Sequence, residues 1–216
     1  MLKGKEIASM ENILFDSNDM VKAGCNDCEG CFDCCRGMGQ SIVLDPYDIY
    51  MLEKNLKCSF EALLQNKVEL QVVDGLILPN LKMQENSEKC GFLNEEGRCS
   101  IHTFRPGLCR LFPLGRNYND GELKYFLLDN ACQKQNHTKI KVKKWLDVPE
   151  LKQYEKFLVD WHYFRKRLQE AIVQMQSDED IKALNMKMLQ LFYLMPYQRD
   201  DFYEDFSERM SKWTLR

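Results

Sequence analysis

The C-terminal third of the chain carries an apolar stripe at helical spacing. From Pro149 onward, side chains of one stripe recur at alternating steps of three and four residues, with Arg165 as its one charged member. Such a recurrence follows one face of a helix, so the pattern predicts a long amphipathic helix. The stripe consists of Leu151, Tyr154, Leu158, Trp161, Arg165, Leu168, Ile172 and Met175.

Two shorter helices are predicted after the long one. Ser177 and Asp180 are spaced as in a capping box, which favours a helix start, and Pro196 ends the pattern. We interpret the Met and aromatic stripes of this region as core; a docking groove for a partner helix or peptide is the alternative. The second helix carries Ile181, Leu184, Met188, Leu191 and Phe192, and the last carries Phe202, Phe206, Met210 and Trp213.

Shorter helices are predicted nearer the N-terminus. Asp45 before Pro46 is typical of a helix start, because the carboxylate caps backbone N–H groups and proline needs no hydrogen bond there. Ser59 suggests a second short helix directly afterwards. The first helix places Ile49, Leu52 and Leu56 on one face, and the second contains Glu61, Leu63 and Leu64.

Turn dipeptides predict two hairpins. Asp74-Gly75 accepts the positive φ angles of a tight primed turn between the strands 68–73 and 76–83. Pro79 weakens the return strand or places it at an edge, because proline has no N–H to donate. Asn119-Asp120-Gly121 predicts a second hairpin, which continues with an alternation of Leu123, Tyr125 and Leu127.

The composition of the chain changes near residue 144. All ten cysteines lie at or before Cys132, and all three tryptophans lie after it. The sequence therefore predicts an α+β protein in which residues 1–144 form a small, metal-organised, cysteine-rich domain of short helices and hairpins. Residues 145–216 are expected to form a C-terminal helical region of about three helices.

Charge limits the classes of partner. A formal net charge of −3 over 216 residues gives no global signal for nucleic acid or for an anionic membrane. Residues 133–144 are a local exception, with five lysines and no acid. We interpret this stretch as a solvated connector; binding of an anionic partner or a substrate phosphate is the alternative.

The N-terminal residues bear on the compartment. Residues 1–19 lack the apolar core and the cleavage site of a secretory signal, and no stretch is apolar and long enough to span a membrane. We therefore expect a cytoplasmic protein. In a reducing compartment, the cysteines remain thiols or bind metal, which disfavours disulfides.

Five cysteines lie within eleven residues, and four of them, Cys25, Cys28, Cys31 and Cys34, follow a step of three with Cys35 directly behind. Three sulfurs at this step, with a fourth from a distance, hold a four-iron cluster in bacterial ferredoxins. Paired zinc knuckles are separated by about twelve residues or more, whereas two residues separate the pairs here. The spacing favours iron and sulfide, with zinc as the alternative.

A second motif completes a resemblance. Residues 99–110 read C-S-I-H-T-F-R-P-G-L-C-R, and Cys90 and Cys132 flank them. Together with C-x2-C-x2-C-C at residues 28–35, this closely resembles the CxxCxxCC cysteine-cluster family, which is described as a zinc- or iron-chelating domain and to which flagellin lysine N-methylases are related. The resemblance covers residues 28–132, about half of the chain.

The resemblance implies eight metal ligands, which are Cys28, Cys31, Cys34, Cys35, Cys90, Cys99, Cys109 and Cys132. Cys25 lies outside the family pattern and is either an additional ligand or a simple thiol. Cys58 also lies outside it and is expected to be a buried small hydrophobe. His102 stands where the family commonly has tyrosine, and we expect it to be packed and hydrogen-bonded rather than a ligand.

Eight thiols divide into two sets of four. Because adjacent side chains tend to diverge, Cys34 and Cys35 are expected to face different centres. The first centre would then take Cys28, Cys31 and Cys34 with one downstream cysteine, and the second would take Cys35 with the other three. One cluster plus one zinc ion, or one larger cluster with spare thiols, are alternatives.

Two arginines flank Cys109 in sequence. A thiolate-bound cluster carries negative charge, so Arg105 and Arg110 are expected to offset that charge and to bond sulfur or nearby carbonyls. The alternative for either arginine is a carboxylate partner elsewhere.

The sequence favours an iron–sulfur protein with one or two [4Fe–4S] clusters, acting in electron transfer or in cluster-assisted protein modification. Lysine methylation rests on analogy alone, because no glycine-rich nucleotide loop follows a strand and Met38 interrupts the cysteine triplet of radical enzymes. A zinc-binding structural or interaction module and a metal storage or delivery protein are the alternatives. The expected partner is a protein substrate or a redox protein.

Overall fold

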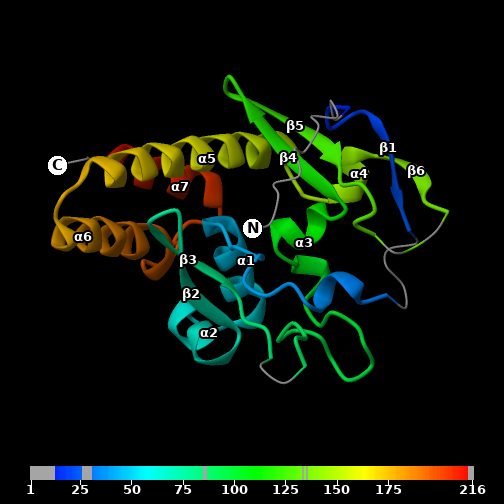
Figure 1. The fold of residues 1–216 in the computed structure, drawn as a ribbon, viewed down its shortest axis with the longest axis horizontal. Coiled ribbons are helices and arrows are strands. Elements are labelled where there is room, and N and C mark those ends of the chain that lie inside the picture. Colours follow the sequence, from blue (N-terminus) through cyan, green and yellow to red (C-terminus); the bar gives the residue numbers. More distant parts are fainter. Residues whose placement is uncertain (1–12, 26–30, 85–86, 133, 135, 214–216) are drawn as a thin grey trace, which may run out of the picture.

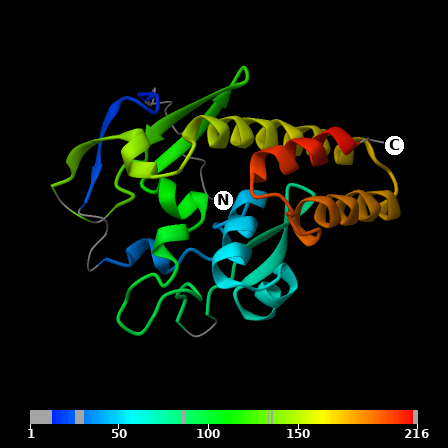
Figure 2. The ribbon, with the colours of Figure 1, turned by 180° about the vertical axis from the view of Figure 1, so that it is seen from behind.

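The computed structural model describes residues 13–25, 31–84, 87–132, 134 and 136–213. One end of the molecule is helical and contains α5 (Leu151–Gln174), α6 (Asp178–Leu189) and α7 (Phe202–Lys212) (Figure 1). The opposite end carries the strands β1 (Met20–Gly24) and β6 (Thr138–Lys141). Seen from behind, α7 lies alongside α5 (Figure 2). The fold is α+β, as the sequence predicts.

Both predicted hairpins are confirmed. In the first, β2 (Val68–Val73) pairs with β3 (Leu76–Leu81) through a turn in which Asp74 has φ 49° and Gly75 has φ 83°. These two positive φ angles are those of the expected primed turn. Pro79 stays within β3, where its carbonyl accepts a hydrogen bond from Leu44 N at 2.8 Å.

The second hairpin pairs β4 (Leu114–Asn119) with β5 (Glu122–Leu127), and Asp120 and Gly121 form its turn with φ 48° and 82°. A third antiparallel pair joins β1 to β6, with Val21 opposite Ile140. Nothing in the local sequence pattern predicts this pair, because its strands come from segments more than a hundred residues apart.

The capping residues of the first two helices act as predicted. Asp45 accepts a hydrogen bond from Asp48 N at the start of α1 (Pro46–Leu56), and Ser59 accepts one from Ala62 N at the start of α2 (Phe60–Asn66). Ile49 and Leu52 of the predicted face are buried, whereas the exposed fraction of Leu56 is 38%. Leu56 is the last residue of α1, and the next residue already has a positive φ angle, so the buried face has ended.

The helices of the C-terminal region follow the predicted stripes. Helix α5 buries Tyr154, Phe157, Leu158, Trp161, Phe164, Leu168 and Ile172. Helix α6 begins after its Ser177 cap and continues into a π-helical turn, η4 (Gln190–Leu194), before Pro196. Among the described residues, no helix combines the length and the apolar character needed to cross a bilayer.

Two hydrophobic cores hold the molecule together. The larger contains Ile49 of α1, Leu78 of β3 and Trp161 of α5, so it draws residues from both sides of the compositional change near residue 144. The smaller core packs β1, β5 and helix α4 (Val142–Leu146) together, with Tyr125 fully buried. The division of the chain into domains at residue 144 stays a prediction.

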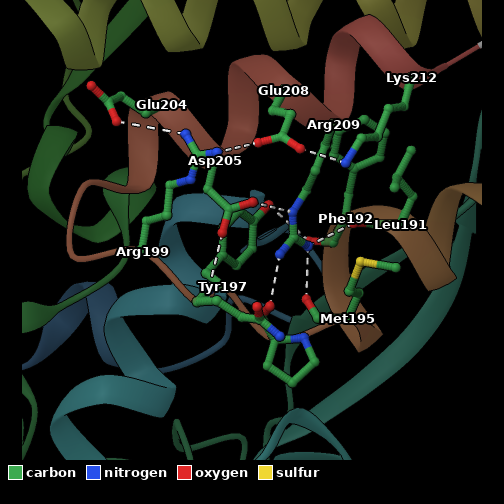
Figure 3. A network of polar contacts seen from close by, with 12 residues as sticks. Leu191, Phe192, Met195, Tyr197, Arg199, Glu204, Asp205, Glu208, Arg209 and Lys212 are labelled. Atoms are coloured by element: carbon green, nitrogen blue, oxygen red, sulfur yellow. Dashed lines mark hydrogen bonds and ion pairs between the residues drawn. The ribbon is translucent and has the colours of Figure 1, made fainter.

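Buried Arg209 fastens the end of α6 to α7 (Figure 3). Its exposed fraction is 3%, and its guanidinium donates to Asp205 Oδ1 at 3.0 Å and stacks over the ring of Tyr197 at 3.6 Å. It also donates to the carbonyl oxygens of Leu191, Met195 and Pro196 at 2.7, 2.7 and 2.8 Å. The C-terminal carbonyls of a helix need such donors, and a cation there is favoured by the helix dipole.

Replacing this side chain is expected to destabilise the helical end strongly. Arg209→Met leaves three carbonyl oxygens and Asp205 without their donor, so the free energy of unfolding should fall by about 3–5 kcal/mol. The measurement is denaturant unfolding followed by circular dichroism. The matched control is Arg199→Met, which removes an exposed arginine paired with Glu208 and should cost less than about 1 kcal/mol. Equal losses of unfolding free energy in the two variants would contradict the proposed role of Arg209 in holding the end of α6 to α7.

Candidate metal centre

Several loops meet beside α1. The short 3-10 turn η2 (Asp33–Cys35) is joined to the Cys90 segment by one backbone hydrogen bond. Cys90 N donates to Cys35 O at 2.8 Å. Isolated backbone bridges pair Met83 with Cys90 and Leu93 with Cys99. Three predicted ligands from distant segments are therefore held together by single backbone contacts.

Helix α3 (Gly107–Leu111) brings Cys109 to the same place. Its first residue, Gly107, donates its backbone N–H to Asp48 Oδ1 at 2.7 Å. A Cβ atom at Gly107 would collide with Tyr154 Oη and lie 2.9 Å from Arg116 Nη2. Only glycine fits this contact, and the contact fixes where α3 points.

The loops and α3 enclose a cavity of about 50 Å³. Apolar side chains that include Ile42, Leu81, Phe112 and Trp145 form much of its wall. Six of the eight predicted ligands also line it, namely Cys31, Cys34, Cys35, Cys90, Cys99 and Cys109. Cys28 lies outside the described residues. Cys132 lines a neighbouring hollow of about 470 Å³ instead.

Four of the thiols around the cavity have raised pKa values. Burial, the largest cause, raises the pKa of Cys90, Cys99 and Cys109 above the ordinary value of a thiol. For Cys35, a hydrogen bond with Cys34 is the largest cause of a raised pKa, followed by burial. Metal binds the thiolate, so a metal entering this cavity must displace those protons.

Cys34 lies between two groups of thiols. The expectation that Cys34 and Cys35 face different centres stays a prediction, although their side chains are hydrogen-bonded to each other. Cys34 also interacts electrostatically with Cys90, Cys99, Cys109 and Cys132.

The second group centres on Cys132. Burial raises the pKa of Cys132, and the nearby thiols of Cys25, Cys31 and Cys34 raise it further. Cys31 and Cys34 thus connect the two groups, since they line the cavity as well. Within the described part of the chain, which omits Cys28, no three cysteine, histidine or acidic side chains already stand in a metal-binding arrangement. The division of the ligands between two centres stays a prediction.

The two arginines differ in what they contact. Arg105 lines the cavity, donates to His102 Nε2, and its charge favours the thiolate of Cys99. Arg110 points away, donating to Thr103 O at 2.6 Å and to Asp147 O at 3.1 Å. Arg110 therefore bonds carbonyl oxygens, which is one of the expected roles. Of these two arginines, Arg105 is the one that lies beside the thiols.

Some relevant residues escaped the sequence reasoning. Asp48 follows a predicted helix start and has no further signal in the sequence, yet its exposed fraction is 4% and its carboxylate accepts the N–H of Gly107 in α3. Trp145 belongs to the C-terminal region in sequence, yet it lines the cavity and donates Nε1 to Leu111 O. Cys58 is only partly buried; it packs against the larger core and does not line the cavity.

Comparison with known families agrees with this arrangement. The model of the CxxCxxCC domain, described as a "putative zinc- or iron-chelating domain", matches residues 27–143, more than half of the chain. The chain belongs to the CxxCxxCC family. The match covers every predicted ligand from Cys28 to Cys132 and leaves Cys25 just outside it. No curated protein and no solved structure matches the chain significantly.

The Gly107 contact can be tested directly. Gly107→Ala forces α3 away from Tyr154 and Asp48, so we expect a loss of about 1–3 kcal/mol in the free energy of unfolding together with a lower bound-metal content. Gly91→Ala is the control, because it also adjoins a predicted ligand but its Cβ would meet only ordinary contacts, the nearest being Lys82 O at 3.4 Å. If Gly107→Ala matches the wild type in unfolding free energy and in metal content, Gly107 does not fix the position of α3.

Asp48 should make stability depend on pH. Burial, reinforced by the neighbouring Asp45 carboxylate, raises the pKa of Asp48 to about 8. The unfolded chain releases this proton at pH about 4, before the folded chain does, so the free energy of unfolding should fall as pH rises from about 4 to about 8.

The Asp48→Asn variant cannot lose that proton, so its unfolding free energy should fall less steeply over the same range. Asn also keeps an oxygen that can accept from Gly107. Asp129→Asn, at an exposed carboxylate, is the control and should keep the wild-type slope. If the unfolding free energies of the wild type and Asp48→Asn change with pH in parallel, the titration of Asp48 does not cause the loss of stability.

Proposed function

We propose that this chain binds one or two [4Fe–4S] clusters through its cysteines and acts in electron transfer or in cluster-assisted protein modification. Its membership of the CxxCxxCC family indicates chelation of zinc or iron. The finer choice of iron and sulfide is supported by the three-residue step of Cys25, Cys28, Cys31 and Cys34, which matches a ferredoxin loop.

The observation that carries the proposal is the set of donors around the cavity. Six thiols line it, and no described carboxylate does. Soft thiolate ligands suit iron–sulfur clusters and zinc, whereas carboxylate-rich sites suit harder cations. The apolar wall also limits the access of water, which is one determinant of a cluster's reduction potential.

The residues of the chain would divide the work as follows. The inner centre would be held by Cys35, Cys90, Cys99 and Cys109. The outer centre would be held by Cys28, Cys31, Cys34 and Cys132. This is the division expected from the sequence, with Cys132 as the fourth ligand of the outer centre. Arg105 would offset negative charge at the thiolates. A bound cluster would supply a centre that gains or loses one electron.

Zinc is the second candidate, and the size of the cavity favours it. A volume of about 50 Å³ holds roughly four water-sized spheres, since each requires about 10–15 Å³. The described thiols must rearrange around either metal, and a four-iron cluster requires them to move further apart than one ion does. A colourless, zinc-stabilised interaction module would follow. Metal storage or delivery, the third candidate, has the extra thiol of Cys25 beside Cys132 in its favour.

Anaerobic purification distinguishes the candidates. We expect a brown protein that absorbs at about 400 nm and contains iron and acid-labile sulfide in equal amounts. A colourless protein with stoichiometric zinc under the same conditions would overturn the iron–sulfur proposal in favour of zinc.

Single substitutions then assign the thiols. Cys109→Ser removes a ligand from the inner cavity with little change in volume, so metal and sulfide content should fall. Cys58→Ser is the matched control, because Cys58 does not line the cavity, and it should retain wild-type content. Equal metal content in both variants would remove Cys109 from the ligand set.

A further inference from the structure

The β1–β6 ribbon gathers lysines on one surface. Lys22 of β1 lies directly opposite Lys139 of β6, and Lys141 is the next outward residue of β6. Val21 and Ile140, between them, face the smaller core. Helix α4 follows β6 directly and adds Lys143 and Lys144. We call the five exposed lysines the basic face: Lys22, Lys139, Lys141, Lys143 and Lys144.

This arrangement costs stability. Like charges directly opposite each other in a strand pair are unfavourable, and Lys22 and Lys139 are such a pair. Among the described residues, none of the five lysines of the basic face has an ion pair with a carboxylate. Elsewhere on the surface, lysines pair with acids: Lys124 with Asp16 at 2.6 Å and Lys156 with Asp160 at 2.5 Å.

The basic face adjoins the outer group of thiols. Cys25 directly follows β1, and the β1–β6 pairing places Gly24 opposite Thr138. Cys25 in turn interacts electrostatically with Cys132. Lys22 and Cys132 line the same hollow of about 470 Å³. In Figure 1, this end of the molecule lies opposite α6. Lysine side chains, with Asp129 as the one acid among the described residues of the hollow, therefore lie beside the predicted outer ligand Cys132.

We propose that the basic face docks an acidic protein at the outer end of the metal centre. In identifying that protein as a redox partner, the inference rests on the proposed function: a bound cluster would accept one electron from a reduced acidic carrier, which would be oxidised, and no bond would change. Complementary charge of this kind raises the association rate and fixes the orientation of weak, transient complexes.

A protein fits this face better than a nucleic acid does. The basic face contains lysines only, without the arginine forks that read phosphates and bases, or the aromatic platforms on which bases stack. The whole chain has a net charge of −3, so a long polyanion that extends past the ribbon meets repulsion. A compact acidic patch avoids that repulsion.

Binding of a fluorescently labelled short acidic peptide, hexa-L-glutamate, to the purified chain tests the docking. Fluorescence anisotropy should report binding that weakens as salt shortens the Debye length from about 30 Å to about 8 Å. Lys139→Glu/Lys141→Glu should lower the affinity about tenfold or more, because two attractions become repulsions. Lys166→Glu/Lys182→Glu carries the same charge change on exposed residues of α5 and α6 and should bind almost as wild type does.

A second variant, Lys143→Gln/Lys144→Gln, leaves the ribbon unchanged and should also weaken binding. Absence of salt-dependent binding, equal losses in the basic-face and control variants, or tighter binding of a DNA oligonucleotide than of a glutamate peptide of the same charge would each overturn the inference. Metal and sulfide content is measured on the same preparations. A wild-type chain that contains iron and sulfide but does not bind the acidic peptide refutes the docking surface alone, whereas zinc in place of iron refutes the redox role alone.

Discussion

Helix α3 reaches the other thiols only because its first residue has no side chain. Gly107 fits between α1 and α5, where Asp48 accepts its N–H and Tyr154 closes over it. Arg116 in turn donates to Tyr154 Oη at 3.0 Å. Through this contact, the position of Cys109 depends on the larger core, which both parts of the chain build. The candidate centre is therefore supported by ordinary packing as well as by its own loops.

Because of this packing, several of the thiols are buried. Their raised pKa values follow chiefly from burial, and in Cys35 from the hydrogen bond with Cys34. Metal must therefore compete with protons for each sulfur, and its affinity is coupled to pH. The loops that carry Cys90 and Cys99 are joined to their neighbours by isolated bridges, which leaves them the freedom to adjust around a metal.

Part of the site could be read from the sequence, because ligand spacing and residue type are local. The C-x2-C-x2-C-C string and the later motif identified the thiols that line the cavity, and the turn dipeptides placed both hairpins. The side-chain directions of Cys34 and Cys35 could not be read, since they depend on how η2 turns against the Cys90 loop. The role of Asp48 could not be read for the same reason: its partner, Gly107, is 59 residues away.

The sequence by itself determined helices α1, α2, α5, α6 and α7, both hairpins, the capping residues and the cysteine frame of this protein. Each depends on contacts within a few residues or on the choice of donor atom. Only the tertiary structure decided that β1 pairs with β6, that lysines from both strands share one surface, and that Arg209 spans three carbonyl oxygens. These features join distant segments, and their partners are set by the packing of the two cores rather than by any local pattern.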